Sequence, residues 1–179
     1  GSKVVMGGIH PTVVPGLVLQ DRNVDIVVKR EGEEILNQLY GAIKKGKSYS
    51  RIKGISFRAG NGRIVHNELA PLFENLDAPP QFPYSMFENR LDRYDLGFVM
   101  SARGCPYNCI FCSQKLVSGR HYRFKSSEKV IEDIGLLIGK YKMKRISFFD
   151  DNFVVDKERT KRLCRLLREK GFHKKAKFI

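Results

Sequence analysis

Apolar residues near the start of the chain form two short runs. Residues 3–7 read Lys-Val-Val-Met-Gly and end at the pair Gly7-Gly8, and residues 24–29 are β-branched between polar neighbours. Short apolar runs bounded in this way are typical of strands buried in a parallel sheet. We therefore predict a buried parallel strand in each run.

A one-sided helix and a hairpin are predicted next. In residues 32–46, Glu33 and Glu34 occupy the first helical turn, where the helix dipole favours acids. Behind them the apolar positions recur at helical spacing, and they are Ile35, Leu36, Leu39, Tyr40 and Ile43. Residues 52–58 and 63–66 flank Ala-Gly-Asn-Gly, whose glycines and asparagine tolerate the positive φ of a tight turn, so these residues predict a β-hairpin.

Residues 68–97 lose this regularity because four prolines interrupt them. We interpret this stretch as an ordered connector between a first domain, residues 3–67, and a second, residues 98–179.

The second domain alternates strands with helices. We predict strands at 98–101, 145–150 and from 176, separated by helices at 127–142 and 157–170. Strand, helix, strand, helix, strand predicts a parallel α/β arrangement. Ser126 or Ser127 can cap the first helix and Asp156 the second, because each places an oxygen near unpaired N–H groups.

Composition adds a strong and uneven positive charge. The 179 residues carry a formal net charge of +14, and residues 113–179 hold 19 Lys and Arg against 8 Asp and Glu. A basic surface of this kind is most often a solvated face, and without an aromatic-rich nucleic-acid motif we do not expect specific nucleic-acid binding. No apolar run approaches the roughly 18 residues of a membrane span, and no secretory signal is visible, so we expect a cytoplasmic protein.

Three of the four cysteines fall within eight residues: Cys105, Cys109 and Cys112. This spacing lets three thiolates converge on one centre, which favours a metal or cluster site over disulfides in a reducing compartment. A zinc site would need a fourth ligand, and His121 is the only imidazole nearby, whereas an iron-sulfur cluster would keep one iron open. Inert thiols are the third alternative.

The surrounding residues, Ser101-Ala-Arg-Gly-Cys-Pro-Tyr-Asn-Cys-Ile-Phe-Cys112, resemble the signature of radical S-adenosylmethionine (SAM) enzymes. The resemblance implies a [4Fe-4S] cluster on the three cysteines whose open iron binds SAM, and reductive cleavage of SAM to a 5′-deoxyadenosyl radical. It also implies that Phe111 lies near the adenine, although packing in a core is an equal alternative for this side chain.

The first segment resembles a narrower group, the cobalamin-binding radical SAM proteins, which include methyltransferases and anaerobic magnesium-protoporphyrin monomethyl ester cyclases. The matching stretches begin with Val5-Met-Gly-Gly-Ile-His-Pro-Thr12 and Val24-Asp-Ile-Val-Val-Lys-Arg-Glu-Gly-Glu-Glu34. The resemblance implies the C-terminal part of a flavodoxin-like cobalamin-binding domain, with Gly7 and Gly8 near the cofactor, followed by the first half of a partial (β/α)6 radical SAM barrel.

Two departures from that family qualify the expectation. No histidine has an aspartate two positions before it, so the Asp-x-His-x-x-Gly loop that supplies the axial ligand of cobalt is absent from these residues. A barrel of six units needs roughly 190 residues, since eight take roughly 250, and only residues 98–179 follow the connector. We therefore expect a fragment of an enzyme, inactive alone, whose parent holds any cobalamin.

Other residues have weaker claims. Asp150 and Asp151 lie where the second predicted barrel strand ends, which is where active sites of barrels lie, and either could accept hydrogen bonds from the amino group of SAM, with a turn and cap as the alternative. Arg103 and Arg123 could pair with a substrate carboxylate or form structural ion pairs. We predict Cys164 to be a buried, inert thiol, because it lies on a helix beside leucines.

The sequence thus predicts a SAM-cleaving iron-sulfur enzyme for methyl transfer or cyclisation. A small-molecule substrate and a reductant such as flavodoxin or ferredoxin are the expected partners. A tRNA methylthiotransferase is one alternative, although residues 1–104 lack the further cluster cysteines of that family. A zinc-bearing, nucleic-acid-binding module without catalysis is the other.

Overall fold

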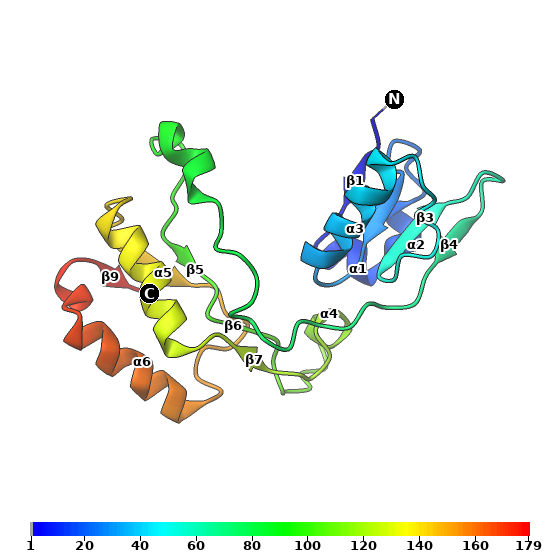
Figure 1. The fold of residues 1–179 in the computed structure, drawn as a ribbon. Coiled ribbons are helices and arrows are strands. Elements are labelled where there is room, and N and C mark those ends of the chain that lie inside the picture. The colour runs from blue at the N-terminus through cyan, green and yellow to red at the C-terminus, as the bar shows by residue number, and fades with distance from the viewer. Residues whose placement is uncertain (1) are drawn as a thin grey trace. The chain divides into compact units, whose positions relative to one another are not determined.

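The computed structural model describes residues 2–179 and divides them into two compact units. The first unit, here the N-terminal unit, contains the residues up to Phe73 together with residues 108–119. The second, here the C-terminal unit, contains residues 74–107 and 120–179. Each unit has its own apolar core. Figure 1 labels the helices and strands of both units.

The N-terminal unit is built on a four-stranded mixed sheet in the order β1-β2-β3-β4. The predicted parallel pairing of the first two runs is confirmed, since β1 (Val5–Met6) lies parallel to β2 (Ile26–Val28). The predicted hairpin is confirmed as well, with β3 (Ile55–Arg58) antiparallel to both β2 and β4 (Ile64–His66). The predicted burial of the first strand is wrong, because β1 lies at the edge of the sheet and Met6 is 40% exposed.

Side chains alternate across β2, so this strand contributes to a core on each face of the sheet. Ile26 and Val28 pack with Ile35 and Leu39 of α3 (Glu33–Lys44), the predicted helix. Val27 packs on the other face with a small cluster that includes Val18 of α2 (Pro15–Val18). Burial from both faces explains why the strand is apolar throughout.

Two short helices complete this unit. The helix α1 (Ile9–Val13) follows β1, and α4 (Gln114–Val117), from the far end of the cysteine segment, packs against it. Only two of the five predicted apolar positions of α3, Ile35 and Leu39, are buried, because Leu36, Tyr40 and Ile43 are exposed in this structure.

The C-terminal unit contains the predicted parallel α/β alternation (Figure 1). Its sheet has the order β5-β8-β9, formed by Phe98–Val99, Arg145–Phe148 and Lys177–Phe178, and both pairings are parallel. The helices α5 (Ser127–Gly139) and α6 (Lys157–Glu169) connect these strands and pack on each other. Short 3-10 helices lie at Tyr84–Arg90 and Phe172–Lys174.

The core of this unit is formed mainly by α5, whose Ile134 and Leu137 are fully buried with Ile146 of β8 and Leu163 of α6. Residues from 68–97 contribute too: Tyr84 and Leu96 belong to the same cluster. Both predicted caps are present, because Ser126 Oγ accepts the N–H of Lys129 and Asp156 Oδ1 accepts the N–H of Arg159.

Several short elements were not predicted, among them the helices α1, α2 and α4 and a small ribbon. The two-residue strands β6 (Ala102–Arg103) and β7 (Arg123–Phe124) pair antiparallel and form a separate ribbon on either side of the cysteine segment in the chain. They are too short to leave a periodic signal in the sequence. Within residues 2–179, none of the helices has the length and apolar content needed to cross a bilayer.

Candidate iron-sulfur site

The cysteine segment presents three accessible thiols. Cys105 is partly exposed, Cys109 and Cys112 are exposed, and none of them forms a disulfide. The backbone N–H of Cys112 donates to the carbonyl oxygen of Cys109 at 3.2 Å, and the N–H of Gln114 donates to Cys112 Sγ at 3.4 Å. Hydrogen bonds to sulfur are one of the means by which proteins tune iron-sulfur ligands.

Apolar side chains around these thiols point to solvent. Ile110 is 97% exposed, Phe111 is 89% exposed and Tyr107 is 59% exposed. The alternative that Phe111 packs in a core is therefore wrong for this structure, and its ring is available for contact with a ligand. Across residues 2–179, no group of three or more His, Cys, Asp or Glu side chains is already assembled to hold a metal ion.

The residues that lead into Cys105 are held by two adjacent carboxylates. Asp150 Oδ1 accepts the N–H of Ser101 at 2.6 Å and that of Ala102 at 2.9 Å, and its Oδ2 accepts the hydroxyl of Ser101 at 2.5 Å. Asp151 Oδ2 accepts the N–H of Gly104 at 2.8 Å. The residues that follow β8 thus fix the start of the cysteine segment. The predicted place of both aspartates at the carboxyl end of this strand is confirmed, although the strand ends at Phe148 and not at Asp150.

A buried arginine, Arg159, holds the same segment by donating a hydrogen bond to the backbone carbonyl of Ser101. Arg159 Nη2 donates to the carbonyl oxygen of Ser101 at 2.8 Å, and the guanidinium lies 5.1 Å from the ring centroid of Phe124. Sequence reasoning missed this residue. The signal was its place in the stripe Arg159, Leu163, Leu167, where a charged residue at helical spacing with buried leucines needs an interior partner.

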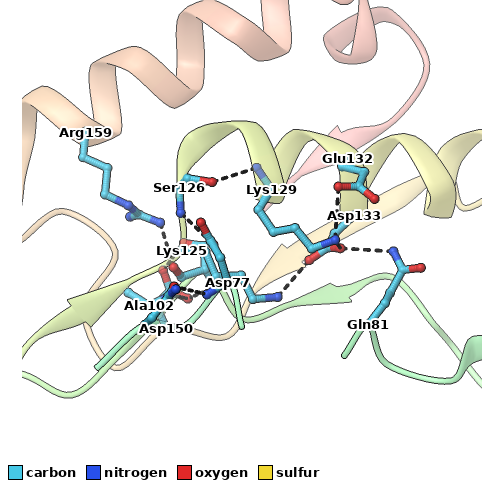
Figure 2. A network of polar contacts seen from close by, with 12 residues as sticks. Asp77, Gln81, Ala102, Lys125, Ser126, Lys129, Glu132, Asp133, Asp150 and Arg159 are labelled. Carbon is cyan, nitrogen blue, oxygen red and sulfur yellow. Dashed lines mark hydrogen bonds and ion pairs between the residues drawn. The ribbon is translucent and has the colours of Figure 1, made fainter. Parts of the chain in front are cut away.

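A second polar network surrounds the first turns of α5 (Figure 2). Asp133, which is 5% exposed, accepts from Lys125 Nζ at 2.8 Å and from Gln81 Nε2 at 3.1 Å. Asp77 Oδ1 accepts the N–H of Ser126 at 3.0 Å. These contacts connect residues 77–81 and the end of the ribbon to the helix, so that a buried carboxylate has its partners.

The remaining predicted residues have varied surroundings. Gly7 and Gly8 are exposed, and an added Cβ on Gly8, whose φ is +104°, would meet no atom within 4 Å. Arg103 is half-buried and Arg123 is 4% exposed. His121 lies 3.5 Å from Glu74, with both side chains exposed.

The prediction for Cys164 is wrong, because this thiol is exposed. The reason is geometric: the buried face of α6 runs through Leu163 and Leu167, four residues apart, and the residue after Leu163 lies about 100° further around the helix. Proximity to leucines in the sequence did not place it in the core.

Comparison of the fold identifies the class of architecture. The chain has the fold of the radical SAM methyltransferase TsrM of Kitasatospora setae, with a TM-score of 0.73 and 20% identity over 96% of this chain and 34% of that one. It also matches the cobalamin-dependent SAM radical enzyme OxsB, with a TM-score of 0.70 and 23% identity over 94% of this chain and 24% of that one. Other structures of these two enzymes contain cobalamin and a [4Fe-4S] cluster, or aqua-cobalamin and SAM.

Relatives by sequence agree with that architecture. An uncharacterized methyltransferase of Pyrococcus horikoshii is 36% identical over 172 residues, which cover 94% of this chain and 37% of the relative. The anaerobic magnesium-protoporphyrin IX monomethyl ester cyclase of Cereibacter sphaeroides is 29% identical over 184 residues, covering 97% and 29%. No family model matches the chain.

These relatives and structural neighbours are enzymes, and they confirm the resemblance to cobalamin-binding radical SAM proteins that the sequence predicts. The chain spans about a third of the length of the two curated relatives.

Proposed function

We propose that this chain is part of a radical SAM enzyme that uses a [4Fe-4S] cluster for cobalamin-dependent methyl transfer or cyclisation. The observation that carries the proposal is the set of free thiols of Cys105, Cys109 and Cys112, in a chain similar along nearly its whole length to a methyltransferase. In this proposal, residues 3–67 are the C-terminal part of a flavodoxin-like domain. Residues 68–97 connect them to the first half of a partial barrel, residues 98–179.

The donor set fits the cluster. Three thiolates leave one iron without a protein ligand. The hydrogen bond that the backbone N–H of Gln114 donates to Cys112 Sγ stabilises a negatively charged sulfur. When bound, the cluster and SAM supply an electron and a carbon-centred radical. The chain itself holds the cluster at its cysteines and presents groups that SAM can contact.

Two exposed groups are candidates for contact with SAM. Phe111 lies within the cysteine segment, and Asp151 is hydrogen-bonded to Gly104, the residue before Cys105. Phe111 offers an apolar ring face of the kind on which an adenine stacks. Asp151 is exposed and already linked to Gly104, so its carboxylate can accept N–H bonds from a cationic amine. The predicted direct contact of Asp150 with the same amine stays a prediction.

For cobalamin, the residues of this chain fit a supporting role. Gly7 and Gly8 follow β1, and the open space at Gly8 lets a nucleotide tail approach the backbone closely. None of the four histidines lies in an Asp-x-His-x-x-Gly sequence, so we assign no cobalt ligand to these residues. The substrate of the whole enzyme would be a small molecule, the electron would come from a flavodoxin or ferredoxin, and the location would be cytoplasmic.

The test is anaerobic reconstitution of the full-length protein with iron and sulfide. We expect a brown protein with broad visible absorption, which Cys105→Ala, Cys109→Ala and Cys112→Ala each abolish because each removes a thiolate ligand. Cys164→Ala is the matched control and should retain the cluster. Stoichiometric zinc without sulfide in the purified protein, or loss of the cluster in the Cys164 variant, would contradict the assignment.

A further inference from the structure

Every polar atom of Ser101 is bonded within the C-terminal unit. Its N–H and hydroxyl both donate to Asp150, at 2.6 Å and 2.5 Å, and its carbonyl oxygen accepts from Arg159 Nη2 at 2.8 Å and from the N–H of Lys125 at 2.9 Å. The residue is completely buried. A small side chain held in this way fixes the backbone at its position, because movement would leave several buried groups unpaired.

The carboxylate of Asp150 is directed at this backbone. It accepts three hydrogen bonds, two from the N–H groups of Ser101 and Ala102 and one from the Ser101 hydroxyl, and the side chain is half-buried. Asp151, by contrast, is exposed and bonds the N–H of Gly104. The two adjacent acids therefore have different surroundings, although the sequence predicts the same possible role for both.

Arg159 closes the arrangement from α6. It is 6% exposed, its Nη1 lies 3.4 Å from the hydroxyl of Tyr122, and its guanidinium stacks on Phe124 of β7. The first turn of α6, capped by Asp156, directs this side chain inward. The residues that follow β5 and β8, the ribbon and the start of α6 thus meet at Ser101, four positions before Cys105.

We propose that Asp150 is a positioning residue for the iron-sulfur cluster: together with Arg159 it fixes the backbone at Ser101 and Ala102, just before Cys105, so that this cysteine reaches the metal in one orientation. This inference rests on the proposed function. It differs from a direct role in binding SAM, because a positioning role needs hydrogen-bond acceptors aimed at Ser101 and does not need the charge.

That difference defines the experiment, which uses full-length protein reconstituted with iron and sulfide and contains no SAM. Asp150→Ala removes all three hydrogen bonds. Loss of an outer contact of this kind typically lowers metal affinity by about tenfold or more. We therefore expect iron to pass to a chelator about tenfold faster than from the unaltered protein. Its reduced cluster should also give an altered electron paramagnetic resonance spectrum. Asp150→Asn should stay close to the unaltered protein, because the amide oxygen keeps both N–H bonds and the Ser101 hydroxyl can rotate to accept from the amide nitrogen.

Ser101→Ala tests the same contact without touching the acid. It removes the hydroxyl bond and leaves the two N–H bonds, so we expect a smaller acceleration in the same direction, which decides the matter if Asp150→Ala does not fold by circular dichroism. Asp92→Ala, at an exposed acid of the same unit, is the control and should behave like the unaltered protein.

The outcomes separate the two proposals. An unaltered protein that takes up no iron and sulfide overturns the proposed function itself. A normal cluster that Asp150→Ala and Ser101→Ala leave unchanged, in spectrum and in iron release, overturns only the assignment of Asp150. A separate measurement of SAM binding by equilibrium dialysis gives the other contradicting result: if Asp150→Asn keeps a normal cluster but loses affinity for SAM, the direct contact replaces the positioning role.

Discussion

Gly97 lies so close to Arg145 that a Cβ added to the glycine would be 2.1 Å from the arginine carbonyl oxygen. The two residues are at the start of the pairing between β5 and β8, where the N–H of Ser147 donates to the carbonyl oxygen of Gly97 at 2.7 Å. The glycine is required here by close backbone approach, since no φ restriction is present at this position.

A side chain at this position should separate the two strands. We expect Gly97→Ala to lower the free energy of unfolding by about 1–3 kcal/mol, the usual cost of overpacking, as measured by urea denaturation. Gly139→Ala is the control, because a Cβ there meets nothing within 4 Å and alanine favours the helix. Equal stability of the two variants would contradict the close approach.

Asp95 should make stability depend on pH. A hydrogen bond from Arg145 at 2.6 Å, aided by the N–H of Gly97, holds the pKa of its carboxyl below the ordinary value of 3.8. The unfolded chain therefore binds the proton first, so this contribution is present above about pH 4 and is lost as pH falls through the folded pKa. Because the pair is partly exposed, we expect less than about 1 kcal/mol.

The measurement is the urea midpoint between pH 6 and pH 3. Asp95→Asn and Arg145→Gln should each flatten this profile by a similar amount, because each removes one member of the same pair. A profile that neither substitution changes would show that the pair contributes nothing in solution.

Arg30 has a φ of +64°, a conformation that strains residues with a Cβ. Its N–H donates to Thr12 Oγ1 at 2.8 Å and its Nε donates to the carbonyl oxygen of Leu116 at 3.3 Å. Arg30→Gly and Arg30→Ala lose the same side-chain bond, so their difference reports the strain, and glycine should be more stable by about 1 kcal/mol. Gln38→Gly and Gln38→Ala, inside α3, are the control pair, and there the alanine variant should be the more stable one. Thermal denaturation of the four variants decides the point.

Cys164 should react with iodoacetamide in the folded holoprotein, because its thiol is exposed. Cys105, Cys109 and Cys112 should be protected by the cluster in the same sample and become reactive after chelation of iron. Mass spectrometry of tryptic peptides measures both. If Cys164 is labelled slowly and the reaction becomes faster only in denaturant, the thiol is buried and the expectation is contradicted.

Asp151→Asn should weaken SAM binding by the full-length protein without removing the cluster, since it neutralises the exposed carboxylate proposed to receive the amino group. Because hydrogen bonds to charged groups contribute about 1.5–3 kcal/mol, the loss should be about tenfold or more in affinity, measured by equilibrium dialysis. Asp150→Asn combined with it should add little. Unchanged affinity in the double variant would reduce both acids to structural residues.

The sequence by itself determined the elements whose signal is local. Helix periodicity and caps placed α5 and α6, because Ser126 and Asp156 bond N–H groups three residues away. The parallel pairs and the hairpin followed from short apolar runs and their turn residues. The spacing of the three cysteines, and the resemblance it carries, needed no coordinates either.

Only the tertiary structure decided which side chains meet across long separations. Asp150 contacts Ser101 from 49 residues away and Arg159 contacts it from 58, distances along the chain at which no periodic pattern operates. The same limit explains Cys164 and Leu36, whose neighbours in sequence predicted burial although burial depends on what packs against a helix face. Local propensity fixed the elements, and long-range packing gave two adjacent aspartates different surroundings.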